Sequence, residues 1–417
     1  MKIGIISWHV CTSYGGTEKF SVILANEMIY RGHDITVFYS THKENENFAF
    51  MLKKLNSKVI LKNIFLDISL FNEPGKLNKF SKELQKAAEI INKSNIDVLV
   101  FIVGWYTADL VFAGLSKYLT LPSVASVRNS PSKINSKYSM QEHVALILSS
   151  TNIQVLFPSY KNFYPQFLQD KLYDIPNTIK VENLIQKTFH HRKKIVSLGR
   201  FDDSTKRFSI LIKAFSMLKK DFPDWALTIC GDGPSMKNYQ KLIASLNLHS
   251  HIFLPGPIPS PDPYFLYSDI FCIPSAFEGF PNVLLEAQAF SLPLVGFQDC
   301  LGVNEVIIPE YNGFLAEEPT ASSLAAKLGK LMESESLRTE YGVNAFDSLA
   351  KYDFKETFDK WERMIYETQC CKSLHWNNDK SEEFFIKSLH ASVTQYSMNS
   401  YKNIYQINKK LKKSSFN

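Results

Sequence analysis

The chain has 417 residues, with 47 Lys and Arg against 41 Asp and Glu, for a net charge of +6. At roughly 100–200 residues per domain, this length predicts two or three domains. A composition of 45% hydrophobic and 21% charged residues excludes a disordered or fibrous chain. The six cysteines show no CxxC spacing, which argues against a disulfide scaffold and a cysteine-based zinc site. We expect reduced, mostly buried thiols in a cytoplasmic protein.

The positive charge is concentrated at the C-terminal end. Residues 372–417 hold eight Lys against three acids, so the rest of the chain is nearly neutral. A neutral body argues against a nucleic-acid-binding face. No targeting segment is expected, because polar residues follow the short apolar run Met1–Ser7. The most apolar window, Ile96–Leu115, is interrupted by charged residues and is a poor membrane span.

The first half of the chain alternates short apolar strands with amphipathic helices. After a first strand, a Gly15–Gly16 turn leads into a helix that ends near Arg31, and a Lys-rich helix is predicted at Lys76–Lys93. Continuous apolar strands between helices indicate a parallel, doubly wound sheet that is covered on both faces. The predicted strands are Lys2–Ser7, Asp34–Tyr39, Val59–Lys62, Val98–Val103, Ser123–Val127 and Ile153–Phe157.

The alternation restarts near residue 193, after the polar segment Lys180–Lys193, which is predicted to be a linker. We therefore expect an α/β protein with two Rossmann-like doubly wound domains facing across a cleft. Ligands of such sheets bind beyond the carboxyl ends of the strands. The predicted strands are Lys194–Leu198, Ala226–Cys230, Ile252–Leu254, Ile270–Ile273 and Pro293–Gly296. The predicted helices are Thr205–Lys219, Pro234–Leu246, Pro281–Phe290 and Ala321–Met332.

The strongest chemical signal is the motif Glu278-Gly-Phe-Pro-Asn-Val-Leu-Leu-Glu286, which runs from a strand end into a helix. Gly279 permits a close backbone approach, and Pro281 suits the first helical turn, where a missing N–H costs nothing. Free N–H groups at the positive end of the helix dipole would favour a bound diphosphate. We expect these groups to belong to Asn282, Val283 and Leu284.

The two acids of this motif have separate expected roles. Glu286 lies one turn into the helix, where it would repel phosphate but could accept hydrogen bonds from a ribose diol. Glu278 lies before the turn and nearer to the expected sugar position. The alternative is an ordinary strand–loop–helix with solvated acids.

A second signal is Gly199-Arg200-Phe201 with Lys206, after the first strand of the second domain. Arg200 is expected at the rim of the cleft, and Lys206 at the start of the following helix. Two cations there could neutralise a leaving diphosphate, since charge-assisted hydrogen bonds contribute about 1.5–3 kcal/mol each. The alternative is a pair of surface cations that form ion pairs with Asp202 and Asp203.

Three glycine-containing turns follow predicted strands. Gly231-Asp-Gly-Pro234 could line a nucleotide site, and Leu254-Pro-Gly-Pro257, which contains Gly256, could hold a flat base by backbone contacts. Gly15-Gly16 would form a second phosphate-facing or sugar-facing turn. It is not a GxGxxG fingerprint and lacks the acidic partner, which argues against a dinucleotide.

Together these motifs resemble the retaining glycosyltransferase family 4, with the GT-B fold, of the type that builds bacterial surface polysaccharide. The resemblance covers residues 1–368. It implies an N-terminal acceptor-side domain over 1–180 with a crossover helix at 352–368 and a nucleotide-sugar domain over 190–351. The composition adds a basic C-terminal extension over 372–417. The motifs that carry it are Gly15–Glu18, Arg31–His33, Ile175–Asn177, Gly199–Arg200 with Lys206, Gly231–Gly233, Glu278–Glu286 and Asn312–Gly313.

The resemblance implies catalytic roles for Arg200, Lys206 and Glu278. Many family members also carry a His after a first-domain strand, where this chain has Ser126–Pro131. We expect Arg128 and Asn129 to replace it in contacting the sugar or acceptor, and His9 is an alternative cleft residue. The implied donor-binding residues are Gly15, Gly16, Gly231, Gly256, Gly279, Phe280, Pro281, Asn282, Val283 and Glu286.

The implied reaction is retaining transfer of a hexose or N-acetylhexosamine from a nucleotide diphosphate sugar, with UDP favoured, to a glycan or lipid-linked acceptor. We expect no cofactor and no metal requirement, because no DxD acid pair falls in a suitable loop. Two other functions stay open. One is a nucleotide-sugar 2-epimerase of the same fold, and the other is a non-catalytic partner that binds sugar or nucleotide.

The C-terminal extension lies outside the resemblance. Phe385, Leu389, Val393 and Tyr396 fall near helical spacing, and a basic run Lys409–Lys413 follows. One interpretation is peripheral attachment to an anionic membrane at the inner face of the plasma membrane. The other, which we favour, is a helix packed on the first domain with a disordered basic end.

Overall fold

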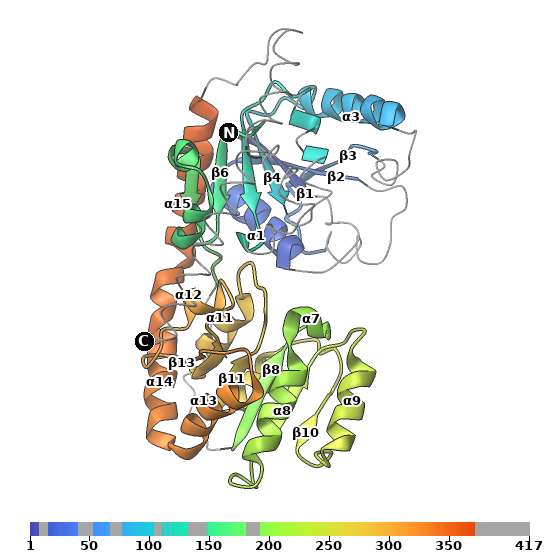
Figure 1. Cartoon of the computed structure of the whole chain (residues 1–417). Coiled ribbons are helices and arrows are strands. Elements are labelled where there is room, and N and C mark those ends of the chain that lie inside the picture. The colour runs from blue at the N-terminus through green and yellow to red at the C-terminus, as the bar shows by residue number, and fades with distance from the viewer. Residues whose placement is uncertain are drawn as a thin grey trace. The chain divides into compact units, whose positions relative to one another are not determined.

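The computed structural model describes residues 1–7, 16–40, 53–66, 77–103, 111–112, 114–116, 118–131, 147, 149–180 and 192–371. The chain divides into two compact units. The N-terminal unit is formed by Met1–Ile175 together with the chain from Phe358, and the C-terminal unit by Pro176–Thr357. Figure 1 shows the elements of each unit.

The N-terminal unit contains a parallel sheet with the strand order β3-β2-β1-β4-β5-β6-β7. Its central strands are buried along almost their whole length, as expected for a sheet covered on both faces. β3 lies one residue later than predicted, β6 begins one residue earlier and ends two residues earlier, and β7 was not predicted. The strands are β1 (Lys2–Ser7), β2 (Asp34–Tyr39), β3 (Ile60–Asn63), β4 (Val98–Val103), β5 (Ser123–Val127), β6 (Asn152–Val155) and β7 (Leu172–Asp174).

Helix α3 is amphipathic and packs through its apolar face into the core of this unit. In α3, Phe80, Leu84 and Ile91 enter the same buried cluster as Phe101 of β4. From Phe358 onward, α15 also belongs to this unit. The helical elements are α1 (Gly16–Tyr30), α3 (Leu77–Asn92), η2 (Pro158–Phe163), η3 (Gln166–Lys171) and α15 (Phe354–Cys370).

Both apolar and polar contacts fix α15 on the N-terminal unit. The rings of Phe20 and Trp361 lie 5.4 Å apart. Asn152 Nδ2 donates to Thr368 Oγ1 at 2.9 Å, and the Tyr173 hydroxyl donates to Glu367 at 2.6 Å. α15 (Phe354–Cys370) thus lies over most of the range 352–368 predicted for a crossover helix, and its last residues are held by strands β6 and β7.

An ionic cluster also joins α15 to the turn between α1 and β2. Arg31 Nη1 lies 2.7 Å from Asp359 and 2.9 Å from Glu362, and its Nε lies 2.9 Å from Glu27. His33 Nε2 lies 2.7 Å from Glu362 Oε1. Arg31 and His33, which the sequence showed only as a motif, thus have a structural role in the attachment of α15.

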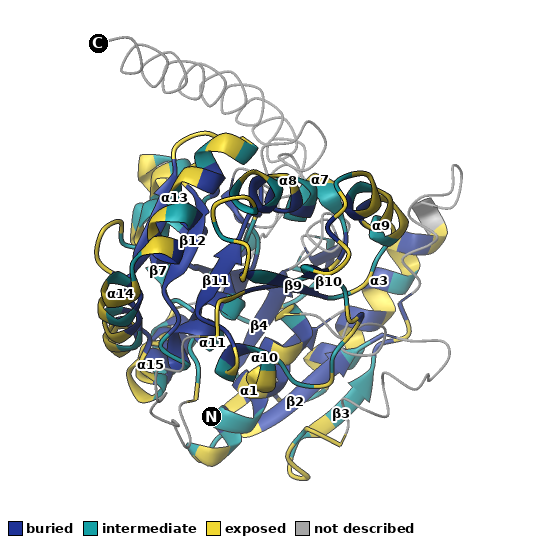
Figure 2. Ribbon diagram, turned by 90° about the horizontal axis from the view of Figure 1, so that it is seen from below, coloured by how far each residue is buried: buried dark blue, intermediate teal, exposed yellow. Residues whose placement is uncertain are grey.

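The C-terminal unit contains a second parallel sheet, with the order β10-β9-β8-β11-β12-β13. Figure 2 shows β11 and β12 buried throughout. β12 lies one residue later than predicted, and β13 was not predicted. The strands are β8 (Lys194–Leu198), β9 (Ala226–Cys230), β10 (Ile252–Phe253), β11 (Ile270–Ile273), β12 (Leu294–Phe297) and β13 (Gly313–Ala316).

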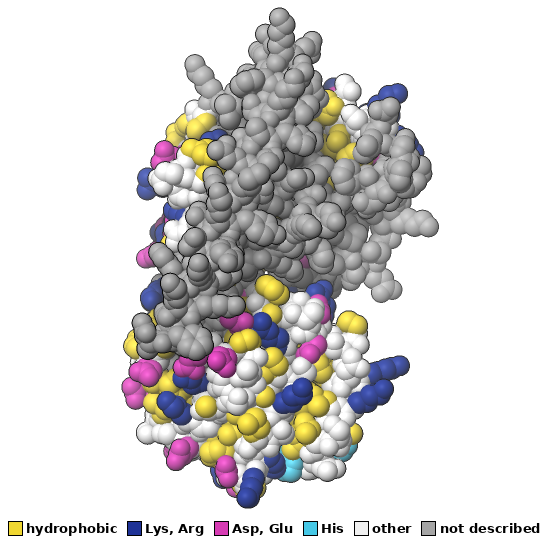
Figure 3. Space-filling model, viewed as in Figure 1, with side chains coloured by type: hydrophobic (Ala, Val, Ile, Leu, Met, Phe, Trp, Pro, Cys, Tyr) yellow, Lys and Arg dark blue, Asp and Glu magenta, His cyan; other side chains and the backbone are white. Residues whose placement is uncertain are grey.

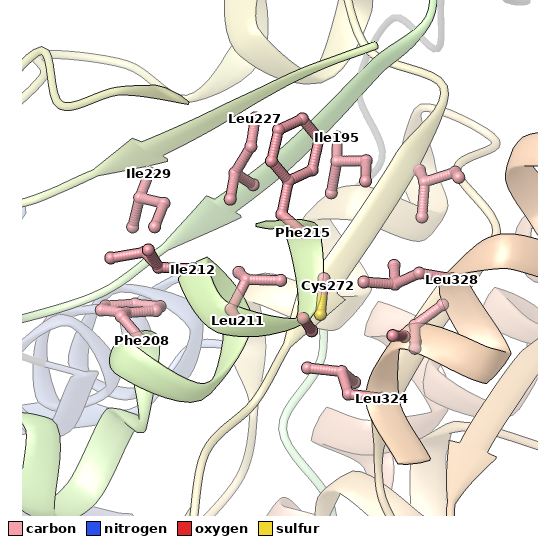
Figure 4. Close-up of a cluster of buried hydrophobic side chains, with 14 of the residues drawn as sticks. Ile195, Phe208, Leu211, Ile212, Phe215, Leu227, Ile229, Cys272, Leu324 and Leu328 are labelled. Atoms are coloured by element: carbon pink, nitrogen blue, oxygen red, sulfur yellow. The ribbon is translucent and has the colours of Figure 1, made fainter. Parts of the chain in front are cut away.

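A buried hydrophobic cluster of this unit lies between the sheet and the helices α8 and α13. Leu211, Ile212 and Phe215 of α8 lie with strand residues such as Leu227 and Ile229 (Figure 4). The helical elements are α7 (Asp203–Lys206), α8 (Phe208–Leu218), α9 (Met236–Ser245), α10 (Asp262–Leu266), α11 (Asn282–Ala289), α12 (Val303–Val306), α13 (Ala321–Glu333), α14 (Glu335–Asp347) and η4 (Ser348–Tyr352).

The helix predicted at Thr205–Lys219 is wrong in one respect, because it is broken into α7 and α8 at Arg207. Arg207 has φ +50° and ψ +31°, in the left-handed region. The Asp203 carboxylate accepts hydrogen bonds from the backbone N–H and hydroxyl of Ser209, which caps α8 separately. Lys206 therefore ends the single turn α7 and does not open the long helix.

The structure also shows how charged side chains, cysteines and apolar helices are distributed. On the face seen in Figure 3, basic and acidic side chains are interspersed over the described part of the C-terminal unit. Cys230, Cys272 and Cys300 are buried, whereas Cys370 and Cys371 are exposed. Among the described helices, none combines the length and apolar character needed to cross a membrane.

Candidate functional site

The strand order of the C-terminal sheet creates a topological switch point between β8 and β11. From β8 the chain moves through β9 and β10 on one side, and it then returns to β11, β12 and β13 on the other. β8 and β11 are direct neighbours, so the loops that follow them leave the sheet in opposite directions. The crevice between such loops is where open α/β sheets bind ligands.

Lys206 and Glu278 meet across this switch point. Lys206 Nζ lies 2.6 Å from Glu278 Oε1, and the two side chains are 20% and 13% exposed. The Ser275 hydroxyl donates to the same carboxylate oxygen at 2.7 Å, and Ala276 N–H donates to Thr205 O at 2.8 Å. The structure thus brings together two of the three predicted catalytic residues as a half-buried ion pair.

Arg200 lies in the loop after β8 but is largely exposed. Its Nη2 is 3.6 Å from Asp202, and its side chain is 60% exposed. The hydroxyl of Ser204, helped by Thr205 and by Arg200, holds the pKa of Asp202 below its usual range. Arg200 thus has the surface ion pair with Asp202 that the alternative predicted, and its catalytic role stays a prediction.

That alternative is wrong for Lys206. Asp203, its proposed surface partner, instead accepts hydrogen bonds from Ser209 and from the Tyr239 hydroxyl at 2.9 Å. Burial, with this hydrogen bond to Asp203, raises the pKa of Tyr239. Asp203 is thus a structural anchor that fixes the turn carrying Lys206 against α8 and α9.

The loops after β8, β9 and β10 are joined by backbone hydrogen bonds. Phe201 N–H donates to Asp232 O at 2.8 Å, and Gly231 N–H donates to Gly256 O at 2.9 Å. A Cβ on Gly231 would lie 1.9 Å from Gly199 O, and Gly231 has φ +144°. Only glycine therefore fits at position 231. At Gly256 a Cβ would have no neighbouring atom within 4 Å, and φ is +84°, so the preference for glycine there comes from the backbone alone.

The start of α11 differs from the prediction. Pro281 is the N-cap residue and does not belong to the first turn. Two of the three N–H groups expected to be free are satisfied internally, because the chain turns tightly here. The Asn282 N–H donates to Phe280 O at 2.9 Å, and the Leu284 N–H donates to Pro281 O at 2.8 Å. Val283 and Glu286 are both half-buried on α11.

Two residues that the sequence did not assign to the site support the start of α11. Asn177 is buried, and its Nδ2 donates to Asn282 Oδ1 at 2.7 Å. The ring of Tyr352 contacts Phe280 edge-on, with centroids 5.7 Å apart, and Thr178 Oγ1 donates to Tyr352 O at 2.5 Å. Asn177 belongs to the motif Ile175–Asn177 named above, and that motif was the only feature of the sequence that pointed to this residue.

The predicted site residues of the N-terminal unit are only partly described. Gly15 and His9 lie outside the described residues, whereas Gly16 is exposed at the start of α1. Arg128 follows β5 and is buried, with its guanidinium 3.7 Å from the centre of the Phe20 ring. Its Nη1 donates to Gln154 at 3.3 Å, and burial lowers its pKa to about 9. The neighbouring Asn129 is half-buried.

The described residues contain no group of three or more His, Cys, Asp or Glu side chains placed to hold a metal ion. The donor-side residues Gly231, Gly256, Gly279, Phe280, Pro281, Asn282, Val283 and Glu286 all follow carboxyl ends of strands in one sheet. Their roles, and those of Arg200, Lys206 and Glu278, stay predictions.

Comparison with known proteins adds independent information. Residues 180–348 match the family model "Glycosyl transferases group 1". An uncharacterized glycosyltransferase of Haemophilus influenzae is 26% identical over 387 residues, which span 87% of this chain and 99% of that protein. The N-acetylgalactosamine-N,N'-diacetylbacillosaminyl-diphospho-undecaprenol 4-alpha-N-acetylgalactosaminyltransferase of Campylobacter jejuni is 29% identical over 244 residues, spanning 56% of this chain and 64% of that protein.

Two solved structures resemble this chain in fold. Anabaena HepE in complex with UDP and glucose superposes with a TM-score of 0.72 at 15% identity, covering 88% of this chain and 100% of HepE. A mutant of TarM from S. aureus, in complex with Fondaparinux, alpha-GlcNAc-glycerol and UDP, gives a TM-score of 0.72 at 15% identity, with coverage of 87% and 99%. The chain therefore has the GT-B fold and is a relative of glycosyltransferases, with a C-terminal unit that matches glycosyl transferases group 1.

Proposed function

We propose that this protein is a retaining glycosyltransferase. It transfers a hexose or N-acetylhexosamine from a nucleotide diphosphate sugar to a glycan or lipid-linked acceptor during synthesis of cell-surface polysaccharide. The observation that carries the proposal is the Lys206–Glu278 pair at the switch point between β8 and β11. It places a cation and an acid where such sheets bind ligands, next to the start of α11.

The proposed chemistry is electrostatic. The bond between the anomeric carbon and the diphosphate oxygen breaks, and negative charge develops on the diphosphate. Lys206 and Arg200 favour that charge by preorganised attraction, an effect that is typically worth about 2.7–4 kcal/mol of barrier for each lost donor. The acceptor oxygen forms its bond to carbon on the same face, and its proton passes to the leaving phosphate.

In this proposal the cations of the protein neutralise the diphosphate, so turnover does not require a divalent metal. Glu286 accepts hydrogen bonds from the ribose hydroxyls, and Glu278 contacts the donor sugar when Lys206 turns toward phosphate. Arg128 and Asn129 remain the candidates for contacts with the sugar or acceptor from the N-terminal unit.

The donor and acceptor classes rest on the relatives. HepE and TarM were solved with UDP, which favours a UDP-sugar. The C. jejuni relative is named for a diphospho-undecaprenol substrate, which favours a lipid-linked acceptor. We place the reaction in the cytoplasm at the inner face of the plasma membrane. Residues 372–417 lie outside the described residues, and contact of their eight Lys with anionic lipid is the alternative to the packed helix that we favour. Binding to anionic liposomes, with and without residues 398–417, tests that contact.

The first experiment is thermal unfolding of the full chain with UDP, GDP and ADP, each in EDTA and then in Mg²⁺. A ligand at about 100 times its Kd stabilises the folded state by about 2.7 kcal/mol. A UDP shift that persists in EDTA and is lost in Glu286→Ala supports the donor site. No shift with any nucleotide overturns it.

Product analysis separates the enzyme classes. A UDP-sugar that is epimerised without an acceptor would contradict transfer and favour the 2-epimerase. Wild-type biological function in a Lys206→Ala, Glu286→Ala double variant would favour the non-catalytic partner.

A further inference from the structure

Arg207 and Asp299 form a forked ion pair that the proposed chemistry does not use. Arg207 Nη1 lies 3.0 Å from Asp299 Oδ1, and Nη2 lies 2.9 Å from Oδ2. The side chains are 21% and 35% exposed, and the guanidinium carbon lies 5.7 Å from the centre of the Phe297 ring. A two-bond fork fixes orientation as well as distance, which a single surface contact does not.

The positions of the two residues connect successive loops at the same edge of the sheet. Arg207 directly follows Lys206, and Asp299 lies in the loop after β12. Lys206 is paired with Glu278 in the loop after β11. Two consecutive cations thus bind acids from two successive loops, so the turn that carries Lys206 is tied to both.

The backbone conformation at Arg207 favours glycine over arginine. Its φ of +50° lies in the left-handed region, which glycine occupies at little cost and other residues disfavour. Its N–H donates to Asp203 O, and its C=O accepts from Ile210 N–H, both at 3.0 Å. The turn therefore suits glycine, whereas this chain carries an arginine that reaches Asp299.

The loop held by Asp299 has its own internal bonds and a buried reporter. Asn304 Nδ2 donates to Gln298 O at 3.1 Å, and Gly302 turns the chain with φ +90°. Cys300, next to Asp299, is fully buried. Release of the loop from Arg207 would expose this thiol, which makes its alkylation a local measurement of loop opening.

We propose that Arg207 and Asp299 form a positioning clamp that holds the loop of residues 298–302 against the α7 turn, so that this loop and Lys206 present one preorganised surface to the donor diphosphate. The proposal rests on the proposed function for the identity of the ligand. Neither clamp residue is assigned contact with the substrate; Arg207 acts through the loop and through the position of Lys206.

The test compares wild type with Arg207→Gly, Asp299→Asn and the double variant. Arg207→Gly removes the side chain at a backbone position that favours glycine, so the fold should keep its wild-type Tm. Three quantities are measured: alkylation of Cys300 by mass spectrometry, amide hydrogen exchange over residues 298–306, and the Kd for UDP. The matched control is Lys193→Gln with Asp224→Asn, which removes an exposed ion pair of the same unit at the amino ends of the strands.

We expect faster Cys300 alkylation and faster exchange in each clamp variant, and UDP affinity reduced about tenfold, equivalent to the loss of about 1.4 kcal/mol. The double variant should resemble the worse single variant, because residues of one pair are not additive. The control should match wild type in all three measurements.

The contrary outcomes are distinct. Wild-type exchange and alkylation in both single variants would overturn the clamp. A loosened loop with wild-type UDP affinity would overturn the positioning role of the clamp. So would a double variant in which the losses of UDP affinity from the two single changes multiply. If the wild-type chain binds none of UDP, GDP and ADP, the proposed function fails, and exchange and alkylation still decide whether the clamp holds the loop.

Discussion

Asn177 donates a hydrogen bond to Asn282 at 2.7 Å, which joins the segment just after the unit boundary to the first residue of α11. The N-cap residue Pro281 makes no side-chain cap hydrogen bond, and the contact from Asn177 holds the first helical residue through its side chain instead of through a backbone N–H. Because Asn177 is buried, its amide has little water to exchange for this contact. The start of α11 is thus fixed by a residue more than 100 positions earlier in the chain.

Asn177→Leu is expected to destabilise the C-terminal unit by about 1–2 kcal/mol, because the side-chain oxygen Oδ1 of Asn282 loses the hydrogen bond from Asn177. UDP binding should weaken in parallel, because the start of α11 loses its support. Urea unfolding and calorimetry with UDP measure the two effects. Asn344→Leu removes an exposed amide contact to Tyr311 and serves as the control; equal effects at both positions would contradict a special role for Asn177.

Lys206→Ala is expected to lower donor turnover by about 10²–10³-fold while the protein stays folded. The reason is the loss of the cation that favours charge on the leaving diphosphate. Some stability should also be lost, because the half-buried Glu278 carboxylate loses the Lys206 cation, although the Ser275 hydroxyl still donates to it. Adding Glu278→Gln should restore the Tm but not the turnover. Near wild-type turnover in Lys206→Ala would refute the catalytic assignment.

Glu286→Ala is expected to weaken UDP binding with little change in Tm, because the half-buried carboxylate is proposed to bind the ribose diol. Glu286→Gln should fall between wild type and Ala, since an amide can still accept one hydrogen bond. Affinities for UDP and for 2′-deoxy-UDP give the direct comparison. If Glu286→Ala loses the same binding free energy for UDP and for 2′-deoxy-UDP, the Glu286 side chain does not contact the ribose 2′-hydroxyl.

Gly231→Ala and Gly256→Ala should differ strongly, although both glycines are in predicted donor-binding turns. At position 231 the new Cβ would meet Gly199 O at 1.9 Å, so we expect a loss of about 3 kcal/mol from overpacking. At position 256 the space is open and only the backbone conformation is unfavourable, which costs about 1 kcal/mol. Chemical denaturation of both variants checks the order, and the reverse order would invalidate the described packing of the loops.

Stability of the N-terminal unit should fall in acid because of Glu362. Burial raises the pKa of this carboxyl, but hydrogen bonds from His33 and Arg31 outweigh it and hold the pKa below the usual 4.5. A carboxyl group whose pKa is lower in the folded state stabilises that state at pH values above its unfolded pKa. This stabilisation disappears as the pH falls below about 4.5 toward the folded pKa. The other charged groups facing the cluster are Glu27, Asp359 and the Met1 ammonium.

Glu362→Gln should therefore lower the Tm at neutral pH and flatten its decline below about pH 4.5. Thermal unfolding between about pH 3 and pH 7 measures both effects. Glu89→Gln, which changes an exposed carboxylate in an i,i+4 pair with Lys93, is the control. A wild-type acid decline in Glu362→Gln would show that another group is responsible.

The periodicity of the chain was sufficient to predict most of the fold. Apolar runs such as Val98–Val103 and Ile270–Ile273 are strands at the predicted residues, because burial on both faces leaves a continuous hydrophobic signal. β7 and β13 were missed because each is short and only tertiary pairing to a neighbouring strand makes it a strand. The break at Arg207 was missed because a left-handed arginine has no sequence signature.

The candidate site likewise combines groups that the sequence predicted with contacts that only the folded chain shows. Residue types and their spacing were enough to predict its chemical groups: cations after β8, a Glu-containing motif leading into α11, and glycines in the turns after β9 and β10. The pairings emerge only in the folded chain, and they are Lys206 with Glu278, Arg207 with Asp299 and Asn177 with Asn282. Folding also satisfies the Asn282 and Leu284 N–H groups internally. The physical reason is that residue type and local period fix what an element can form, whereas ion pairs and close backbone approaches depend on which strand ends meet at one edge of the sheet.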